Sequence, residues 1–393
     1  MNKSKSTIFI LMGIIVFLLS CSDEFSILMG NYDSFVTNQS AFMVLGNSEF
    51  DNNTGGTTND TFSGPSGIII IGNKIFLADQ GNNRILGFNS IPSTSGSAAD
   101  FVMGQPDFTT SGDQGVSSST MSIFGIASDD SKLFLSDYIN NRILIFNTIP
   151  NSDNPEADIV VGQTDMTSNS SSCSQTTMNL PFDVAASKNK MVVSDYGNNR
   201  ILVYNSIPTS NNTAADFVLG QPDFDQGSIN AGLGPGSPTD RTLFNPGGIW
   251  TDGNSIIIAD GSNSRVLIWK SWPVSNYEPA DIVIGQPDFT TSSIDTTVKK
   301  FILSFYSDIT VSKSGKLYIS DSGNNRVLIY NTIPTNNYAA ANIVLGQENF
   351  TNSSTGLSEN TFNTPAGLFF DENTGQLYVT EYSNNRVLVF KTE

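Results

Sequence analysis

A short turn in which an acidic residue precedes an arginine by five positions is the pattern in this chain that could do chemistry. The first copy reads Asp79-Gln80-Gly81-Asn82-Asn83-Arg84, and Asn and Gly between the charges take positive φ at little cost. Six of the seven arginines occupy this position, and only Arg241 does not. The six pairs are Asp79 and Arg84, Asp137 and Arg142, Asp195 and Arg200, Asp260 and Arg265, Asp321 and Arg326, and Glu381 and Arg386.

Two interpretations of these pairs are open. The arginines could form a ring of positive charge that binds an anionic ligand, or each acid and guanidinium could pair across its own turn as part of a scaffold. We favour the scaffold, because one contact copied into every repeat serves the repeat itself, and the planar fork of arginine suits that role. Calcium binding at the turns is not expected, since Asp-x-x-Asn-Asn lacks the alternating acids of an EF-hand loop.

Other chemistry finds little support in the residue types. The chain has no histidine, which removes the commonest general base and transition-metal ligand. Its net charge of −18 disfavours nucleic acid as a partner. The acids Asp183, Asp252, Asp308 and Asp371 lie near the first strand of their repeats, at positions that do not suggest a constellation. We therefore predict no catalytic residue, no metal and no cofactor.

The arginines recur at intervals of roughly 60 residues, and such a period dictates the fold. Each unit contains four short apolar runs, for example 123–128, 132–136, 142–147 and 157–162, bounded by turn residues. The third run is apolar throughout, which is typical of a strand covered on both faces. Four-stranded sheets covered on both faces are what a radial array of blades provides. The sequence predicts an all-β protein.

The ends of the chain predict how this array closes. The third strand of the last repeat ends at 390, with no fourth strand after it, while 41–50 reads as a fourth strand with no repeat before it. A circle in which this N-terminal strand completes the C-terminal blade satisfies both ends and removes exposed sheet edges.

The repeat, with its aliphatic-x-Asp-x-x-Asn-Asn-Arg turn, resembles the NHL repeat. Leu135 to Phe146 and Val327 to Tyr330 carry this resemblance, which covers 41–393. It implies a six-bladed β-propeller of four-stranded antiparallel blades. Propellers of this kind commonly act as binding scaffolds. A second implied possibility is a calcium-dependent enzyme of the lactonase, esterase or lyase type, with its ion in the central channel.

The N-terminus reads as an export signal. Lys3 and Lys5 precede an apolar run, 8–19, which is too short to span a bilayer. It ends in Leu18-Leu19-Ser20-Cys21, which resembles a bacterial lipobox. That resemblance implies cleavage before Cys21 and acylation of its sulfur, which leaves Cys173 without a disulfide partner. Ser22 follows, rather than the Asp of an inner-membrane retention signal.

We therefore expect a lipoprotein signal peptide at 1–20, a lipidated N-terminus and tether at 21–40, and the propeller at 41–393. The expected location is the bacterial cell envelope, with the outer membrane or cell surface favoured over the inner membrane. The lipid on Cys21 would supply the contact with the membrane.

The loops that connect one blade to the next are the expected place for recognition. They are long and polar: 51–65, 109–123, 167–181, 225–246, 290–306 and 351–365. Two of these loops, 225–246 and 290–306, also carry basic and aromatic residues. A partner-binding patch explains these residues, and neutral variation of solvated loops explains them equally well. The candidate partner-binding residues are Arg241, Phe244, Lys299, Lys300, Phe301 and Tyr306. The predicted function is a lipid-anchored envelope scaffold that presents these loops to a protein or glycan.

Overall fold

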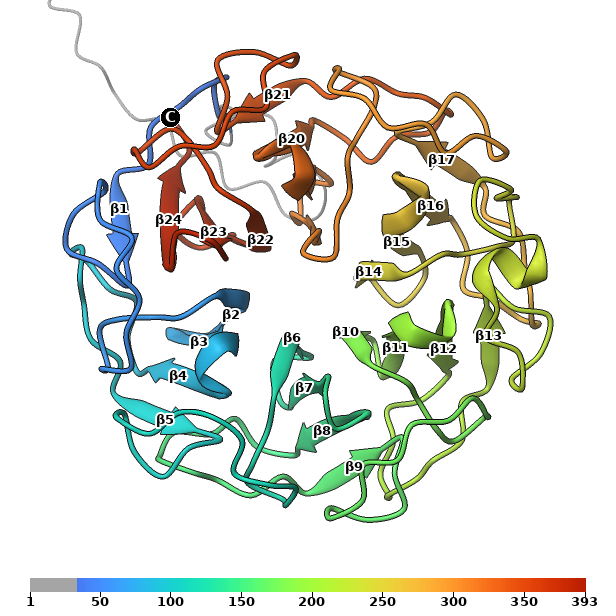
Figure 1. Cartoon of the computed structure of the whole chain (residues 1–393), viewed down its shortest axis with the longest axis horizontal. Coiled ribbons are helices and arrows are strands. Elements are labelled where there is room, and N and C mark those ends of the chain that lie inside the picture. The colour runs from blue at the N-terminus through green and yellow to red at the C-terminus, as the bar shows by residue number, and fades with distance from the viewer. Residues whose placement is uncertain (1–33) are drawn as a thin grey trace, which may run out of the picture.

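Six four-stranded sheets stand around a central axis in the computed structural model, which describes residues 34–393 (Figure 1). Neighbouring strands within each sheet are antiparallel, and in five of the six sheets they follow one another along the chain. Blades 1 to 3 contain β2 (Pro65–Ile71), β3 (Lys74–Asp79), β4 (Arg84–Phe88), β5 (Phe101–Met103); β6 (Ile123–Ser128), β7 (Leu133–Asp137), β8 (Arg142–Phe146), β9 (Ile159–Val161); and β10 (Pro181–Ser187), β11 (Lys190–Asp195), β12 (Arg200–Tyr204), β13 (Phe217–Leu219).

The other half of the ring repeats this plan, which confirms the predicted all-β propeller. Blades 4 to 6 contain β14 (Pro246–Thr251), β15 (Ile256–Asp260), β16 (Arg265–Trp269), β17 (Ile282–Ile284); β18 (Ile309–Val311), β19 (Leu317–Asp321), β20 (Arg326–Tyr330), β21 (Ile343–Leu345); and β22 (Pro365–Asp371), β23 (Gln376–Glu381), β24 (Arg386–Lys391), β1 (Met43–Leu45). The described helices are short 3₁₀ turns: η1 (Gln80–Asn82), η2 (Tyr196–Asn198), η3 (Ile229–Gly232), η4 (Gly261–Asn263) and η5 (Ser322–Asn324).

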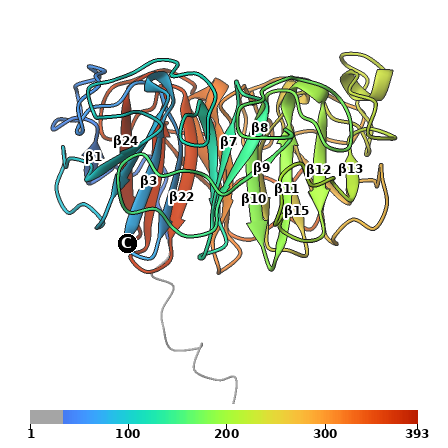
Figure 2. The ribbon, with the colours of Figure 1, turned by 90° about the horizontal axis from the view of Figure 1, so that it is seen from below.

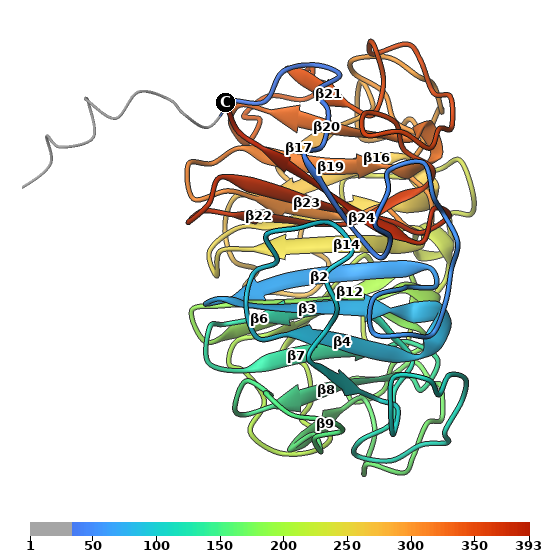
Figure 3. The same ribbon diagram turned by 90° about the vertical axis from the view of Figure 1, so that its left-hand side faces the viewer.

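The ring closes through the N-terminal strand, as predicted. β1 pairs antiparallel with β24, with Met43 opposite Val389 and Leu45 opposite Val387. Figure 3 shows this N-terminal segment running beside the last strand of the chain. Blade 6 therefore joins residues from both ends of the described chain, and its sheet has no missing outer strand.

The packed part of the chain begins before residue 41, which corrects the expected tether boundary. Phe35 is buried between Tyr318 of blade 5 and Phe370 of blade 6. The backbone N–H of Asn38 donates to the carbonyl of Val344. Burial of the apolar Phe35 side chain packs this segment against blades 5 and 6. Residues 1–33, which contain the expected signal peptide and Cys21, lie outside the described residues.

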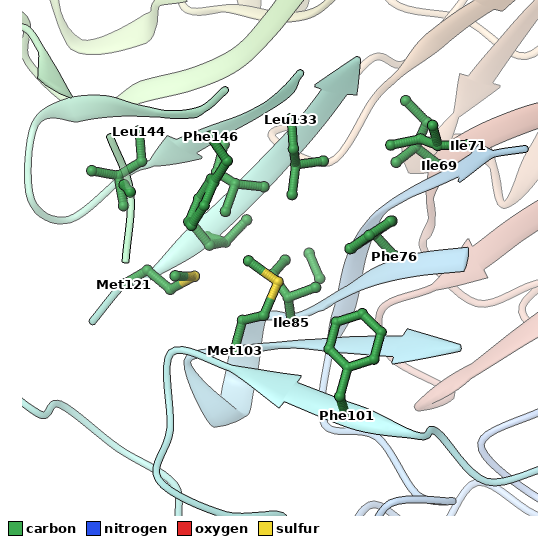
Figure 4. Packing of buried hydrophobic residues seen from close by; sticks show 14 of the residues in the cluster. Ile69, Ile71, Phe76, Ile85, Phe101, Met103, Met121, Leu133, Leu144 and Phe146 are labelled. Carbon is green, nitrogen blue, oxygen red and sulfur yellow. The ribbon is translucent and has the colours of Figure 1, made fainter. Parts of the chain in front are cut away.

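The core lies between the sheets. Between blades 1 and 2, Phe76, Phe101 and Met103 pack against Leu133 and Phe146 (Figure 4). Similar clusters fill the other interfaces between blades. Because both faces of each middle strand are covered in this way, β8, β12 and β20 are buried along their whole length.

The strand order sends two kinds of connection to opposite faces of the disc (Figure 2). Turns between the second and third strands of each blade emerge on the same face as the long connections to the next blade. We call this the loop face. The turns between the first and second strands emerge on the other face, which we call the turn face.

The acid–arginine pairs are fully buried just beneath the loop face. In all six, the arginine Nε contacts a carboxylate oxygen, at 2.7 Å in five pairs and 2.5 Å between Arg386 and Glu381, and both side chains are 0% exposed. In blade 2, Arg142 Nη2 also donates to the carbonyls of Ser117 and Thr120 at 2.8 and 3.0 Å, and Nη1 donates to Met166 at 2.6 Å. Each arginine thus holds the long loop that enters its blade and the start of the loop that leaves it.

The remaining groups of the turn extend this network. Asp137 Oδ1 accepts the backbone N–H of Ser122 at 2.6 Å, where the long loop joins β6. Asn141 takes a left-handed φ of 55°, and its Oδ1 accepts the N–H of Leu180 in blade 3 at 2.8 Å. Ser264 occupies this second position in blade 4 and has no side-chain amide to make such a link. The repeated turn is therefore a scaffold element that also fixes the long loops.

Replacing Arg200 by Ala should lower the unfolding free energy by about 3–5 kcal/mol, because it leaves the Asp195 carboxylate buried without its charge partner. The measurement is thermal and denaturant unfolding of the purified protein. The matched control is Arg241→Ala, because this seventh arginine is 43% exposed; its loss should cost less than about 0.5 kcal/mol. Equal effects of the two substitutions would contradict the scaffold role.

Candidate functional site

A cavity of about 310 Å³ occupies the central channel and is the candidate site. Its wall is built from the innermost strands, which Figure 1 shows converging on the axis. Glycine and aliphatic residues supply about half of the lining, and its aromatic members are Phe124, Phe182, Trp250, Tyr306, Phe369 and Phe370. Exposed Lys313 also lines the cavity, so the cavity reaches the turn face.

Two carboxylates, Asp183 and Asp308, face this cavity. Asp183 Oδ1 accepts the N–H of Val184 at 2.8 Å, and its Oδ2 accepts the N–H of Ile249 in blade 4 at 3.0 Å. Asp308 repeats the arrangement two blades further on, with Ile309 at 2.7 Å and Leu368 of blade 6 at 2.8 Å. Each acid therefore joins the innermost strand of its own blade to that of the next.

The two acids occupy one equivalent position of the repeat, so the expectation that the four acids near the first strands suggest no constellation was wrong for this pair. Each precedes the residue that pairs with the centre of the second strand, Val184 with Val193 and Ile309 with Ile319. The other four blades have glycine there: Gly67, Gly125, Gly248 and Gly367. The signal was thus present in the sequence as Asp replacing Gly in two of six copies.

The glycines are required because neighbouring blades approach closely at this level. A Cβ on Gly125 would lie 2.1 Å from Asp183 Oδ1, and one on Gly248 would lie 2.5 Å from the Asp308 Cα. An acid in one blade thus requires a glycine in the blade before it. Four glycines and two acids satisfy this constraint around the ring.

The remaining two acids considered from the sequence lie elsewhere. Asp252 is in the turn after β14, where it caps the amides of Asn254 and Ser255 and lies 4.0 Å from Lys188 Nζ. Asp371 ends β22 and accepts from the backbone of Asn373. Both support turns on the turn face and contribute nothing to the pair.

Burial is the largest cause of the raised pKa values of Asp183 and Asp308. It raises the pKa of Asp308 to about 7. Burial raises the pKa of Asp183 further above its usual range, and repulsion from the Asp308 carboxylate adds to the effect. Backbone N–H donors oppose these shifts without cancelling them. The cavity therefore contains a pair of carboxyl groups that do not both ionise freely near neutral pH.

Aromatic rings cover the loop-face end of the cavity. Phe305 presents its edge or face to Phe124, Tyr138, Phe182 and Tyr196, with ring centroids 4.9–5.5 Å apart. Further rings extend the cover, as Tyr306 lies 4.2 Å from Tyr382 between centroids. Here β18 has three residues, whereas the innermost strands of the other blades have six or seven. The residues before β18 instead place Phe305 over the channel.

Of the two aromatic residues proposed for partner binding on this loop, Phe301 is buried and Tyr306 is half-buried. Phe301 is 0% exposed and packs in the core between blades 4 and 5, under Gly285. It cannot contact a partner on the surface, and that prediction was wrong. Tyr306 lines the cavity. The sequence did not reveal these locations because both depend on the path of the loop across the ring.

The basic candidates remain on the loop face, but each has local contacts. Arg241 donates to the carbonyl of Tyr277 at 2.5 Å and lies 4.0 Å from Asp240. Lys300 Nζ lies 3.9 Å from Asp295. Lys299 stands over the ring of Tyr338 at 4.8 Å from its centroid, and half-buried Phe244 donates its backbone N–H to Asp260.

Within residues 34–393, no group of three or more His, Cys, Asp or Glu side chains is placed to hold a metal ion. In the same part of the chain, no helix has both the length and the apolar composition needed to span a bilayer. Cys173 is half-buried, with its Sγ 3.5 Å from the carbonyl of Phe224.

Comparison with known proteins supports the repeat assignment. The NHL repeat family matches residues 362–390, which include β23 and most of blade 6. No curated protein matches the chain in sequence. Similar solved structures include virginiamycin B lyase from Staphylococcus aureus, with 11% identity, a TM-score of 0.42 and coverage of 83% of this chain and 94% of that one. A streptogramin B lyase gives 12% identity, a TM-score of 0.40 and coverage of 84% and 93%.

The raised pKa of Asp308 predicts how its carboxyl affects stability across pH. In an unfolded chain Asp titrates near pH 4, so between about pH 4 and 7 the folded state binds more protons than the unfolded state. The contribution of Asp308 to stability is therefore largest below pH 4 and falls as pH rises to 7. Asp308→Gly, which copies the residue of four other blades, should remove this fall.

The measurement is the melting temperature of wild type and Asp308→Gly from pH 4 to 8. The variant should gain stability relative to wild type as pH rises. Subtraction removes the effect of groups whose titration does not depend on Asp308, whereas the coupled Asp183 carboxyl contributes to the difference together with it. A difference that does not change with pH would show that Asp308 titrates normally.

Proposed function

We propose that this chain is a non-enzymatic binding scaffold whose loop face engages a protein partner. The observation that supports the proposal is the anchoring of all six long loops by buried arginines. Polar loops of this length would lose much conformational entropy on binding if they were mobile. Here that entropy is lost on folding, so a partner meets surfaces that are already shaped.

The sector of blades 4 and 5 is the favoured contact region. Leu233 and Ile294 are 56% and 64% exposed on the long loops that enter these two blades. Arg241, Lys299 and Lys300 lie on the same loops. Exposed aliphatic side chains flanked by basic groups suit a partner surface that combines apolar and acidic residues. A glycan partner is less well supported, because this sector has few exposed aromatic side chains. A protein is therefore the better-supported class of partner.

The anchor and the loop face lie on opposite sides of the proposed arrangement. Ser34, the first described residue, accepts a hydrogen bond from the backbone N–H of Glu393 at 3.2 Å, on the turn face. A lipid on Cys21 would therefore hold the turn face toward the membrane and leave the loop face free. This orientation suits a receptor or assembly scaffold at the outer membrane or cell surface.

A calcium-dependent enzyme of the lactonase, esterase or lyase type is the alternative. The observation that favours it is the pair of acids from non-adjacent blades that face one channel. Calcium takes six to eight oxygen ligands, so other groups would have to join Asp183 and Asp308. Calorimetry with calcium on the purified protein separates the two functions, since tight binding at one site would favour the enzyme.

The scaffold is tested by reversing charge in the proposed contact region. Arg241→Glu, Lys299→Glu and Lys300→Glu together should reduce capture of crosslinked envelope proteins by at least about tenfold, since charge pairs at interfaces contribute strongly. The matched control reverses Lys74, Lys132 and Lys188, which lie at the turn face. Mass spectrometry of the captured proteins gives the readout.

A partner retained by the loop-face variant, or lost equally by the turn-face control, would contradict the proposed contact region.

The same membrane preparation tests the proposed lipid anchor on Cys21. The Cys21→Ser chain should move from the membrane fraction to the soluble fraction, because it lacks the acylated sulfur. An unchanged membrane fraction would overturn lipid anchoring.

A further inference from the structure

We infer that the central cavity is a second binding site, for a small organic ammonium ligand that enters from the turn face. This inference does not rest on the loop-face function, because it concerns different residues on the axis of the ring. It follows from three properties of the cavity, namely its charge, its walls and its access.

The charged groups that line the cavity are Asp183 and Asp308, with Lys313 and Glu372 at the turn-face end. Neither Asp183 nor Asp308 forms an ion pair with any residue in the described part of the chain, where the repeat arginines are bound to their own acids. Asp183 is 8% exposed, and the surface that it retains lines the cavity. Each of the four carboxylate oxygens accepts one backbone N–H. Lone pairs remain on all four oxygens for a further donor.

An ammonium group supplies the positive charge and the additional hydrogen-bond donors that this pair of acids lacks. Its N–H groups can donate to carboxylate oxygens of both acids, and its positive charge offsets their repulsion. Because burial prevents the pair from ionising freely, the pair suits one positive charge better than two. The backbone donors hold both side chains in place, so the site needs little rearrangement on binding.

The walls favour an organic cation over a metal ion. Aromatic Phe124, Phe182, Trp250 and Phe369 line the cavity together with Ile68 and other aliphatic residues. Aromatic faces attract ammonium groups and also cover the hydrocarbon part of a ligand. A calcium ion would need several more oxygen ligands, and within residues 34–393 no group of three or more acidic side chains is placed to hold one.

Access is restricted to one end. The Phe305 cluster covers the loop-face end, while Lys313 and Glu372 mark the end at the turn face. The Glu372 carboxylate accepts the backbone N–H of Lys313. The volume of about 310 Å³ accommodates a ligand with one ring and a short aminoalkyl group. Benzylamine is a probe of this class, and benzyl alcohol is its neutral counterpart.

The test is calorimetric titration of the purified full chain near neutral pH with benzylamine, benzyl alcohol and calcium chloride in separate experiments. Benzylamine should bind at one site, at least about tenfold more tightly than benzyl alcohol, because only the amine carries the charge. Calcium chloride should produce no comparable binding. Equal affinity for the amine and the alcohol, or no detectable binding of the amine at millimolar concentration, would overturn the inference.

Variants assign the binding to the acid pair. Asp183→Gly and Asp308→Gly each introduce the residue found at this position in four other blades, and each should weaken benzylamine by at least about tenfold. Asp252→Asn removes an acid outside the cavity and should leave binding unchanged. Melting temperatures establish that each variant is folded. Should either glycine variant fail to fold, the comparison of amine with alcohol on the wild type still decides the question.

The outcomes separate this site from the loop-face function. Unchanged benzylamine binding in both folded glycine variants would show that the acids serve only to link the blades. One-site binding of calcium without binding of the amine would also contradict the inference and would favour the enzyme alternative. Neither result bears on capture of a protein by the loop face, because the acid pair lies inside the ring.

Discussion

The buried pair of a carboxylate and a guanidinium is the contact on which the rest of this propeller depends. Burying two charges costs several kcal/mol for each ion unless their remaining hydrogen-bonding groups are satisfied. Here Arg142 Nε meets Asp137, and its other nitrogens meet backbone carbonyls of two long loops. The acid in turn accepts N–H groups at the end of the loop and from the turn. The long loops therefore supply the groups that make burial of the pair tolerable, and the pair fixes the loops.

Along the axis of the ring a different constraint applies, namely the small space between the innermost strands of neighbouring blades. Innermost strands of neighbouring blades approach so closely that most blades have glycine at the narrowest level. Asp183 and Asp308 fit because Gly125 and Gly248 lie in the preceding blades. The same narrow geometry that forbids most side chains brings two carboxylates to one cavity. Scaffold and candidate site thus arise from one repeated framework, in which the departures from the repeat carry the chemistry.

The sequence allowed prediction of whatever the repeat determines locally. The period, the apolar third strands and the unpaired fourth strand near residue 43 predicted six closed blades, and β1 pairs with β24 accordingly. The constant spacing of acid and arginine likewise favoured a scaffold role. What the sequence did not reveal depends on contacts across blades. Phe301 faces the core, and Phe305 covers the channel, because the loop before β18 crosses the ring before its short strand begins. The acid pair was visible only once the six innermost strands were aligned position by position.

Amide hydrogen exchange, measured residue by residue, tests most directly whether the buried pairs hold the long loops. The informative amides are those that donate to the acids at the ends of the loops, namely Ser63, Asn179, Phe244 and Asn363. We expect these amides to exchange as slowly as amides within the blades, because opening them requires a buried ion pair to open as well. Exchange as fast as that of exposed loop residues such as Gln114 and Ile294 would contradict it.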